Sequence, residues 1–464
     1  MQNDTALSND SRKTYTLAEA LGVARETRCL EIGPGVKSAT PRIFREQFGE
    51  RPAVIVADSS TYAAAGQAVA DAFRAAGRPM LEPFLFLASD LHAESPFVEQ
   101  LESSLRSHTA IAVAVGSGTI NDLAKLASHR VERPYMCVAT AASMDGYTAY
   151  GASITHQGAK QTFFCPAPVA IVADLDVICA APGLMNSWGY ADLMAKVPAG
   201  ADWLLADALG LAPIHAQAWA RVQGRLRELV ADPAGVRNRK PAAIAKLVEG
   251  LMMGGFAIQS ARSTRAASGA EHMFSHMWDM QHHTHNGQTP SHGFKVAIGT
   301  LAATALYERL LAKPLEKLDV EACCAAWPDL NTLLARAQTW LGDGGDVMEV
   351  VAREVGAKHC TPAQLGEQLR LLKKVWPELR ERLKAQLLPL TTLRGMLLDV
   401  GAPTEPEQIG ITRERLRRTY WQASCLRRRY MVLDLALRTS LLETCLDEIF
   451  GPAGLWPSPR QGQA

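Results

Sequence analysis

The sequence predicts an α/β domain with a parallel, doubly wound sheet, followed by an all-helical domain. In the first part of the chain, apolar runs rich in valine and isoleucine alternate with alanine-rich stretches of helical period. Such alternation is typical of parallel sheets whose strands are buried on both faces. After an Ala-Pro-Gly sequence at residues 181–183, stretches with helical period continue almost to the end. The 464 residues are also enough for two domains, each with its own core.

The predicted domains meet at this change of pattern. The α/β domain covers residues 15–182, and the helical domain covers residues 183–456. The polar ends, residues 1–14 and 457–464, are expected to be disordered. The first of these ends carries mixed charge with no apolar run behind it, which predicts neither a signal peptide nor a membrane anchor.

Each expected element rests on a local pattern. Short apolar runs predict strands at residues 54–57, 84–88, 111–115, 136–139 and 169–173. Alanine-rich or otherwise helical patterns predict helices at residues 61–76 and 122–128. In the second domain, arginine- and leucine-rich stretches at residues 363–387 and 412–442 are interpreted as helices with solvated charged faces rather than as a binding surface.

Composition narrows the possible functions. Lys and Arg (48) balance Asp and Glu (47), so the chain lacks the excess of positive charge that is typical of nucleic-acid-binding proteins. No uncharged apolar stretch reaches the roughly 18 residues of a membrane-spanning helix. The best candidate, residues 204–220, is interrupted by Asp and His. The nine cysteines have no CxxC spacing, so reduced thiols in a cytoplasmic protein are expected.

A glycine turn follows the strand predicted at residues 111–115. The segment reads GSGTIND over residues 116–122 and leads into a predicted helix. Backbone N–H groups and the positive end of a helix can bind a pyrophosphate at such a turn, so the segment is a candidate dinucleotide site. The third glycine of the GxGxxG pattern is replaced by Asn121, and an ordinary tight turn is the alternative interpretation.

Asp58 follows the strand predicted at residues 54–57. An acidic side chain at this place can accept hydrogen bonds from a ribose diol and disfavour a 2′-phosphate. It can equally cap the helix that is predicted from Thr61 onward. The sequence leaves both roles open.

The densest chemical signal in the chain is a group of histidines, because half of the 12 lie within residues 272–292. Such clustering favours metal or proton chemistry over isolated structural histidines. His272 and His276 are four residues apart and share one helix face. Because Glu271 precedes His272, the sequence is not the HExxH motif of zinc hydrolases.

A catalytic divalent metal takes about three protein ligands and one open position, so a further ligand must come from elsewhere. Asp192 lies in the segment GYADLMAK at residues 189–196, an otherwise apolar helical stretch where an unpaired carboxylate is costly to bury. A cation would remove that cost. Pairing with Lys196, one helical turn later, is the alternative.

Six motifs occur in order along most of the chain. They are GSGTIND (116–122), PYMCVATAASMDGYTAY (134–150), GYADLMAK (189–196), TRAASGAEHMFSH (264–276), SHGFKVAIG (291–299) and RRRYMVLDLA (427–436). Together they resemble the motifs of the bacterial glycerol-1-phosphate dehydrogenases, in the superfamily of iron-containing alcohol dehydrogenases and dehydroquinate synthases. Several motifs in register are more specific than any one of them.

The resemblance implies a dehydroquinate synthase-like fold, with the active site in the cleft between a dinucleotide-binding domain and an all-helical domain. It implies Asp192, His272 and His292 as ligands of one divalent metal, zinc or nickel in preference to iron. It also implies NAD(H) or NADP(H) as the cofactor and a small phosphorylated substrate. The enzyme would be a cytoplasmic homo-oligomer, a dimer or larger, in phospholipid synthesis, without nucleic-acid partners or membrane insertion.

The resemblance further implies the contacts to cofactor and substrate. The cofactor contacts would be Asp58, Gly116, Ser117, Gly118, Thr119, Ile120, Thr140, Ala141, Ala142, Ser143 and Ala149. Ala149 stands where the family commonly has serine, which leaves one polar contact to the cofactor unsupported. Ala266 stands where proline is usual. Asp145 would contact the substrate, together with the ligand Asp192.

The implied reaction is reduction of dihydroxyacetone phosphate to sn-glycerol 1-phosphate. His276 is a candidate substrate contact and proton donor, with a structural role beside the ligands as the alternative. The candidate donors to the substrate phosphate are Arg265, Lys196, Lys160 and Lys295. Three other functions stay open: a dehydrogenase of unphosphorylated polyols or alcohols such as glycerol, a cyclase resembling dehydroquinate synthase, and an inactive scaffold with a structural metal.

Overall fold

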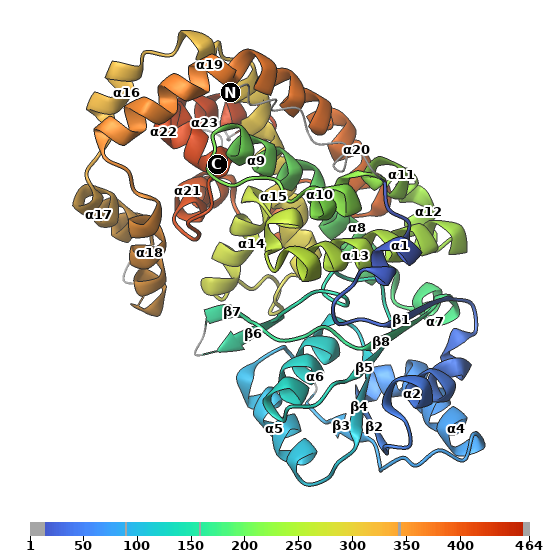
Figure 1. Ribbon diagram of the computed structural model, residues 1–464. Helices are drawn as coiled ribbons and strands as arrows, with labels where there is room; N and C mark the ends of the chain where they lie inside the picture. The colour runs from blue at the N-terminus through green and yellow to red at the C-terminus, as the bar shows by residue number, and fades with distance from the viewer. Residues whose placement is uncertain (1–13, 89–90, 157–158, 342–344, 458–464) are drawn as a thin grey trace, which may run out of the picture.

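The structure, a computed structural model, describes residues 14–88, 91–156, 159–341 and 345–457. The ends predicted to be disordered lie almost wholly outside the described residues. Figure 1 shows a part that contains the strands and, above it, a part made of helices. In the described residues every strand precedes Gly183, where helix α8 begins.

The predicted parallel sheet has six strands in the order β1-β8-β5-β4-β2-β3, all paired in parallel. Their bounds are β1 Cys29–Gly33, β2 Ala53–Asp58, β3 Phe84–Phe86, β4 Ile111–Gly116, β5 Met136–Ala139 and β8 Ala170–Asp174. The five strands predicted from apolar runs are confirmed, with ends that differ by at most about two residues. The sequence pattern misses β1, because its sequence CLEIG is only partly buried and carries a glutamate.

Helices alternate with the strands as predicted. They are α1 (Leu17–Gly22), α2 (Thr40–Phe48), α3 (Ser59–Thr61), α4 (Gln67–Ala75), α5 (Ser95–Arg106), α6 (Gly118–Arg130) and α7 (Leu175–Ala180), with a 3-10 turn η2 (Val36–Ala39) and a π-helical turn η3 (Tyr62–Gly66). The helix predicted at residues 61–76 is divided, because α3, η3 and α4 follow one another there. The helix predicted at residues 122–128 is confirmed as part of α6.

The sheet is covered by helices on both faces. On one face, Ile55 and Val113 pack with apolar residues of α2 and α4. On the other face, Val54 and Ala112 pack with apolar residues of α5 and α6. Figure 1 shows these two helix pairs on opposite sides of the strands. The near-continuous apolar strands of the sequence are explained by this double burial.

Two further strands, β6 (Ala152–His156) and β7 (Ala159–Phe163), form an antiparallel hairpin that the sequence pattern misses. Polar residues interrupt the apolar alternation in both strands, so the period-2 signal is weak. The hairpin lies between the sheet and helix α14 (Figure 1), and β7 contacts α14 directly. It therefore links the two parts of the molecule beside the site described below.

The remaining described chain is helical. The helices are α8 (Gly183–Met194), α9 (Lys196–Ala208), α10 (Ala216–Gln223), α11 (Leu226–Leu229), α12 (Pro233–Arg237), α13 (Pro241–Ala261), α14 (Ala270–Met280), α15 (His292–Leu311), α16 (Val320–Ala326), α17 (Leu330–Leu341), α18 (Gly345–Lys358), α19 (Pro362–Gln386), α20 (Leu390–Val400), α21 (Arg413–Ser424), α22 (Val432–Arg438) and α23 (Leu442–Phe450), with turns η4 (Thr264–Ala266), η5 (Leu315–Lys317) and η6 (Pro406–Ile409). The predicted stretch 363–387 is confirmed as α19. The stretch 412–442 contains two helices, α21 and α22, separated by residues 425–431.

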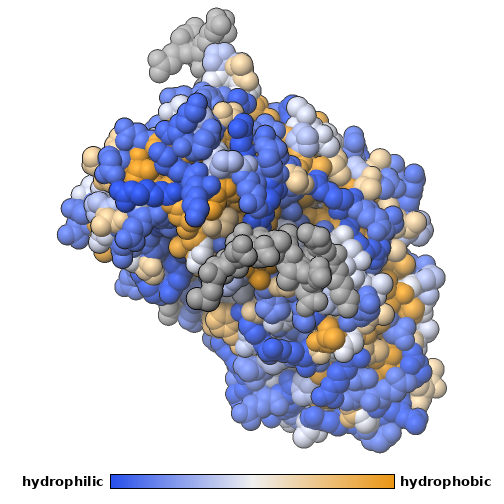
Figure 2. All heavy atoms as spheres, turned by 45° about the horizontal axis from the view of Figure 1, so that its top comes forward, coloured by the Kyte–Doolittle hydropathy of each residue, from blue (hydrophilic) through white to orange (hydrophobic). Residues whose placement is uncertain are grey.

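The segment that comes closest to a membrane-spanning helix is α13 rather than residues 204–220. In the described residues α13 alone is long and apolar enough by length and composition, but 72% of its most apolar window is buried inside the protein. Its apolar character is therefore explained by packing in the core of the helical part. On the face shown in Figure 2, hydrophobic side chains lie in small groups among polar ones.

Candidate active site

The predicted glycine turn lies at the carboxyl end of β4 and leads into α6. Gly116 cannot carry a side chain, because a Cβ there would lie 2.5 Å from the Cβ of Ile120. Asn121, at the place of the missing third glycine, is buried, and its Oδ1 accepts a hydrogen bond from the Tyr135 hydroxyl at 3.0 Å. The first backbone N–H groups of α6 have no partner within the helix, so the turn can bind an anion.

Asp58 caps a helix at the same edge of the sheet. Its Oδ1 accepts the backbone N–H of Thr61 at 2.8 Å, and the Thr61 hydroxyl accepts the N–H of Asp58 at 3.0 Å. The capping interpretation is therefore confirmed. Because β2 lies next to β4, Asp58 and the glycine turn are at neighbouring strand ends. The ribose contact stays a prediction.

Residues 140–151, between β5 and the hairpin, are held by hydrogen bonds instead of regular secondary structure. The N–H of Thr140 donates to the carbonyl oxygen of Gly116 at 3.1 Å, which ties this segment to the glycine turn. The buried Lys125 donates from Nζ, at 2.8 to 3.0 Å, to three carbonyl oxygens, those of Gly146, Ala149 and Gly151. The segment is therefore fixed against α6 along its length.

Helix α8 packs directly on this segment. A Cβ on Gly189 would lie 1.9 Å from the carbonyl oxygen of Ala142, so only glycine permits the approach. The approach brings Asp192, one turn later on α8, to the backbone of Asp145, whose N–H donates to Asp192 Oδ2 at 3.1 Å. The expected cofactor segment and the expected metal ligand are thus in direct contact.

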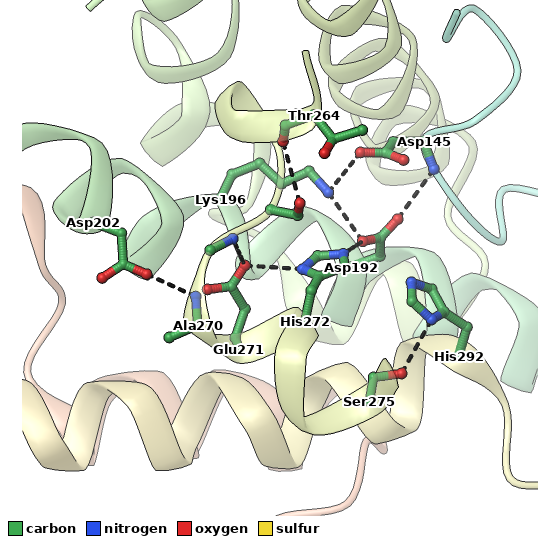
Figure 3. A network of polar contacts seen from close by, with 12 residues as sticks. Asp145, Asp192, Lys196, Asp202, Thr264, Ala270, Glu271, His272, Ser275 and His292 are labelled. Carbon is green, nitrogen blue, oxygen red and sulfur yellow. Dashed lines mark hydrogen bonds and ion pairs between the residues drawn. The ribbon is translucent and has the colours of Figure 1, made fainter. Parts of the chain in front are cut away.

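Asp192, His272 and His292 meet at one point. One ligand atom from each residue lies within 4.8 Å of the ligand atoms of the other two. The residues come from α8, α14 and the first position of α15, and the two imidazole centroids are 5.3 Å apart. Figure 3 shows the Asp192 carboxylate next to both rings. Among the described residues, no other group of three or more potential ligands is placed so that it could hold one metal ion.

Both imidazole rings are oriented through their Nδ1 atoms. His272 Nδ1 lies 2.9 Å from Glu271 Oε1, and His292 Nδ1 lies 3.2 Å from Ser275 Oγ. The Nε2 atom of His272 faces Asp192 Oδ1 at 3.4 Å. Hydrogen bonding of one ring nitrogen, especially to a carboxylate, is the usual arrangement of a metal-binding histidine.

Electrostatics keep two of the three residues in forms that bind cations. Burial alone would raise the pKa of Asp192, but the Lys196 ammonium and His272 hold it well below its ordinary value. Burial and the neighbouring His272 lower the pKa of His292 to about 3. Burial would lower the pKa of His272, but its hydrogen bonds with Asp192 and Glu271 raise it to about 9. Asp192 is therefore ionised and His292 is neutral at neutral pH.

Lys196 pairs with Asp192, which was the alternative explanation for a buried carboxylate. Its fully buried Nζ lies 2.9 Å from Asp192 Oδ1 and 2.7 Å from Asp145 Oδ2 (Figure 3). Burial lowers the pKa of Lys196, but the two carboxylates outweigh this and raise it above its ordinary value. Each carboxylate oxygen has two lone pairs, so Asp192 can bind Lys196 and a further cation together.

A cavity of about 950 Å³ joins these groups. The predicted residues that line it are Ser117, Gly118, Thr119, Ser143, Asp145, Ala149, Lys160, Asp192, His272, His276, His292 and Lys295. The predicted residues that do not line it are Asp58, Gly116, Ile120, Thr140, Ala141, Ala142, Lys196 and Arg265. The cavity therefore connects the glycine turn with the three candidate ligands.

His276 lines the cavity beside the ligands. Its ring centroid lies 6.1 Å from that of His272 and 6.2 Å from that of His292. Burial and the positive charge of Arg427 hold its pKa well below the ordinary value, so the ring is neutral at neutral pH. A neutral imidazole can donate a hydrogen bond from one nitrogen and accept one at the other.

The four predicted phosphate donors lie in different surroundings. Lys196 is occupied by the two aspartates, and the buried Lys295 pairs with Asp279. Arg265 does not line the cavity and donates to the carbonyl oxygen of Tyr430 at 3.4 Å. Lys160, on β7, lines the cavity, and its side chain makes no hydrogen bond or ion pair within the described residues. The four residues therefore do not form one phosphate site.

The sequence interpretation is wrong for two arginines of the stretch 412–442. Arg427 and Arg429 do not lie on a solvated helix face: both are in the link between α21 and α22, and both line the cavity. Arg428, between them, pairs with Glu354 at 2.9 Å and is exposed as the interpretation predicts, although it lies in the link and not on a helix. One feature of the sequence could have indicated an anion-binding role for this link: residues 425–433 contain three arginines and no acidic residue.

Comparison with known proteins gives the class. Residues 31–182 match the family model for iron-containing alcohol dehydrogenase. A probable glycerol dehydrogenase from Sinorhizobium meliloti 1021 has a TM-score of 0.57 at 14% identity and covers 90% of this chain and 96% of its own. Glycerol dehydrogenase from Schizosaccharomyces pombe has a TM-score of 0.58 at 16% identity, with 92% and 91% covered. The protein is an oxidoreductase with the fold of the iron-containing alcohol dehydrogenases.

Relatives at higher identity give the family. Glycerol-1-phosphate dehydrogenase (NAD(P)+) from Halalkalibacterium halodurans is 32% identical over 66% of this chain and 80% of its own length. The proteins of the same name from Geobacillus thermodenitrificans and Methanosarcina barkeri are 27% and 32% identical, over 81% and 60% of this chain and 83% and 75% of theirs. The chain belongs to the glycerol-1-phosphate dehydrogenase family.

Proposed function

We propose that the protein reduces dihydroxyacetone phosphate to sn-glycerol 1-phosphate with NADH or NADPH, assisted by a divalent cation held by Asp192, His272 and His292. The observation that carries this proposal is that the three ligands and the glycine turn line one cavity. A carbonyl near the ligands would lie within reach of a nicotinamide whose pyrophosphate is bound at the start of α6. The names of the relatives support the substrate.

The residues present fit a divalent cation. Two imidazole nitrogens and one carboxylate oxygen are a usual donor set of catalytic zinc sites, which keep one position open for substrate. The Nδ1 atoms of His272 and His292 already have partners, and the Nε2 atom of His272 faces the carboxylate of Asp192, so a bound cation would take the place of the hydrogen between these two groups. This donor set suits zinc and nickel, which we propose in preference to iron. When bound, the ion would supply a Lewis acid that polarises the substrate carbonyl.

The other proposed contacts divide by function. The N–H groups of Ser117, Gly118 and Thr119 would bind the cofactor pyrophosphate at the start of α6. Ser143 and Ala149 line the same cavity as this turn and the ligands, and we propose that they contact the cofactor. Asp145 lines the cavity and would act on the substrate, and its N–H also holds Asp192 at 3.1 Å. Lys196, predicted as a substrate contact, does not line the cavity and would instead hold Asp192 through the contact at 2.9 Å.

His276 is the proposed proton carrier. Hydride transfer to the carbonyl carbon leaves the substrate oxygen in need of a proton. The neutral ring of His276 can donate its N–H hydrogen to that oxygen and accept a hydrogen from water at the other nitrogen. Its position in the cavity beside the two ligand rings, without a hydrogen-bond partner in the described residues, suits this task better than a purely structural role.

A turnover assay tests the proposal. The purified protein is supplied with dihydroxyacetone phosphate and NADH or NADPH, after metal removal and after addition of zinc or nickel, and the product is analysed on a chiral phase. We expect stoichiometric oxidation of the reduced cofactor, dependence on metal, and sn-glycerol 1-phosphate as product. Equal turnover of unphosphorylated dihydroxyacetone would favour a polyol dehydrogenase instead. Substrate conversion without net cofactor consumption would favour a cyclase.

The proposed role of Asp58 predicts a change in cofactor preference. Replacement of Asp58 by asparagine keeps the Oδ1 acceptor for the Thr61 N–H and removes the negative charge. The ratio of kcat/KM with NADPH to kcat/KM with NADH is expected to rise about tenfold, because repulsion of the 2′-phosphate is lost. As a control, Asp71→Asn removes an exposed charge from α4 and should leave the ratio unchanged. An unchanged ratio in Asp58→Asn would leave helix capping as the only role of Asp58.

A further inference from the structure

Arg427 and Arg429 form a cationic wall of the cavity, and within the described residues neither makes an ion pair or hydrogen bond with a carboxylate. The charge of Glu354 acts on both arginines and that of Glu271 on Arg429, in each case without a direct pair. Arg429 donates only to neutral oxygens: to the carbonyl oxygen and hydroxyl of Ser268, at 3.2 and 3.3 Å, and to the hydroxyl of Thr264. The side chain of Arg427 has no hydrogen bond or ion pair within the described residues. Arg428, in contrast, is 59% exposed and takes both oxygens of Glu354.

The two cavity arginines also repel each other. Burial, together with the charges of Arg265 and Arg427, lowers the pKa of Arg429 to about 9, although the charges of Glu271 and Glu354 act in the opposite direction. Guanidinium groups in partly buried positions without a counter-ion are unfavourable, and a bound anion would remove that cost. Planar guanidinium groups bind phosphate oxygens with particular geometric fit. The wall therefore has the chemistry of a phosphate site.

The wall is close to His276, which is itself close to the metal ligands. Arg427 is close enough to depress the pKa of His276, and His276 in turn borders His272 and His292. Thr264 and Ser268, which contact Arg429, line the same cavity immediately before α14. The ligands, His276 and the two arginines thus line one cavity, with His276 close to both groups. A short molecule with a carbonyl at one end and an anion at the other would contact all three.

We propose that Arg427 and Arg429 bind the phosphate group of the substrate, with the Thr264 and Ser268 hydroxyls beside them, and that they distinguish phosphorylated from unphosphorylated substrates. The inference rests on the proposed function, because it names the specificity site of that reaction. Lys295 is less suited to this task because Asp279 neutralises it. Lys160 lines the same cavity, and its charge acts on His276 and His292 as well as on Asp122 and Asp279, but it offers one ammonium group in place of two guanidinium groups.

The test compares Arg427→Met, Arg429→Met and Arg429→Lys with the matched control Arg428→Met from the same link. For each, kcat/KM is measured with dihydroxyacetone phosphate and with dihydroxyacetone, and binding of inorganic phosphate to the metal-loaded protein is measured by calorimetry. Arg427→Met and Arg429→Met each remove one cation that would pair with the substrate phosphate. We therefore expect kcat/KM for the phosphorylated substrate to fall roughly 30-fold or more in each of them. The value for dihydroxyacetone should change by less than about threefold, and Arg429→Lys should recover part of the loss.

The outcomes separate this inference from the proposed function. If the unmodified protein does not reduce dihydroxyacetone phosphate, the proposed function fails, and weaker phosphate binding in the two methionine variants still supports an anion site at the wall. If the unmodified protein reduces it and Arg427→Met and Arg429→Met retain both phosphate binding and substrate preference, the inference is wrong. It is also wrong if Arg428→Met loses as much as they do, or if both substrates are affected equally, because the link would then serve the fold alone.

Discussion

Replacement of His272 by alanine is expected to abolish metal retention and to lower turnover by roughly two to three orders of magnitude or more. The expected effect is this large because removal of a residue that only supports a metal ligand already lowers metal affinity or activity by about 10- to 100-fold. The variant removes one of three ligand atoms that meet within 4.8 Å. It also leaves Glu271 and Asp192 without the imidazole between them. Elemental analysis of the purified variant, together with initial rates in the presence of zinc or nickel, measures both effects.

The control for this experiment is His129→Ala, which removes an exposed histidine from α6 outside the cavity. This variant should retain the metal content and the rate of the unmodified protein. Circular dichroism of both variants checks that the fold is kept. Full metal occupancy and full turnover in His272→Ala would contradict a catalytic ion at this place.

Replacement of Gly189 by alanine should reduce both stability and activity, although Gly189 is not a proposed ligand. The new Cβ would lie 1.9 Å from the carbonyl oxygen of Ala142, so α8 and residues 140–151 must move apart. Overpacking of this kind costs about 1–3 kcal/mol of folding free energy, occasionally more. The movement also displaces Asp192 from Asp145, which should lower kcat by about 100-fold, since roughly 1 Å of misplacement can have this effect.

Gly183→Ala is the matched control, because Gly183 is on the same helix and a Cβ there meets nothing within 4 Å. Its thermal midpoint and kcat should equal those of the unmodified protein. Thermal unfolding followed by circular dichroism and steady-state kinetics distinguish the two glycines. If Gly189→Ala behaved like Gly183→Ala, the close packing of α8 on the cofactor segment would have no functional consequence.

The fold was predictable where local pattern and tertiary packing agree. The strands around Ile55 and Val113 are continuous apolar runs because both faces of the sheet are covered by helices. Such runs can be recognised as strands from the sequence alone. β1 and the β6–β7 hairpin were not predictable, because they are partly exposed and contain charged or polar residues. The break of residues 412–442 into two helices at residues 425–431 contains no proline or glycine that would have indicated it.

The centre of the site was predictable from chemistry combined with family resemblance. The histidine cluster indicated a metal, and the carboxylate in an apolar helical stretch made Asp192 a candidate ligand, with pairing to Lys196 as the alternative. Only the resemblance selected His272 and His292 from the cluster and joined them to Asp192, which is 80 residues from His272. Lys196 was foreseen as a partner of Asp192, but its second bond to Asp145 depends on α8 packing against residues 140–151. No local pattern contains that contact.

The arginine wall shows the opposite case. The arginines of such a stretch are usually solvated, and Arg428 is exposed as this rule predicts, although it lies outside the helices. Arg427 and Arg429 depart from it because the link between α21 and α22 crosses the cavity, which places alternate side chains inside. Such a placement follows from the path of the backbone and cannot be derived from charge spacing.

The proposed metal centre is tested most directly by crystallography of the protein loaded with zinc, with anomalous data collected on both sides of the zinc absorption edge. We expect one anomalous peak per chain, about 2.0–2.2 Å from an oxygen of Asp192 and from the Nε2 atoms of His272 and His292. A catalytically active, zinc-loaded crystal with no peak among these three residues, or with its peak away from the cavity that the glycine turn lines, would contradict the proposal.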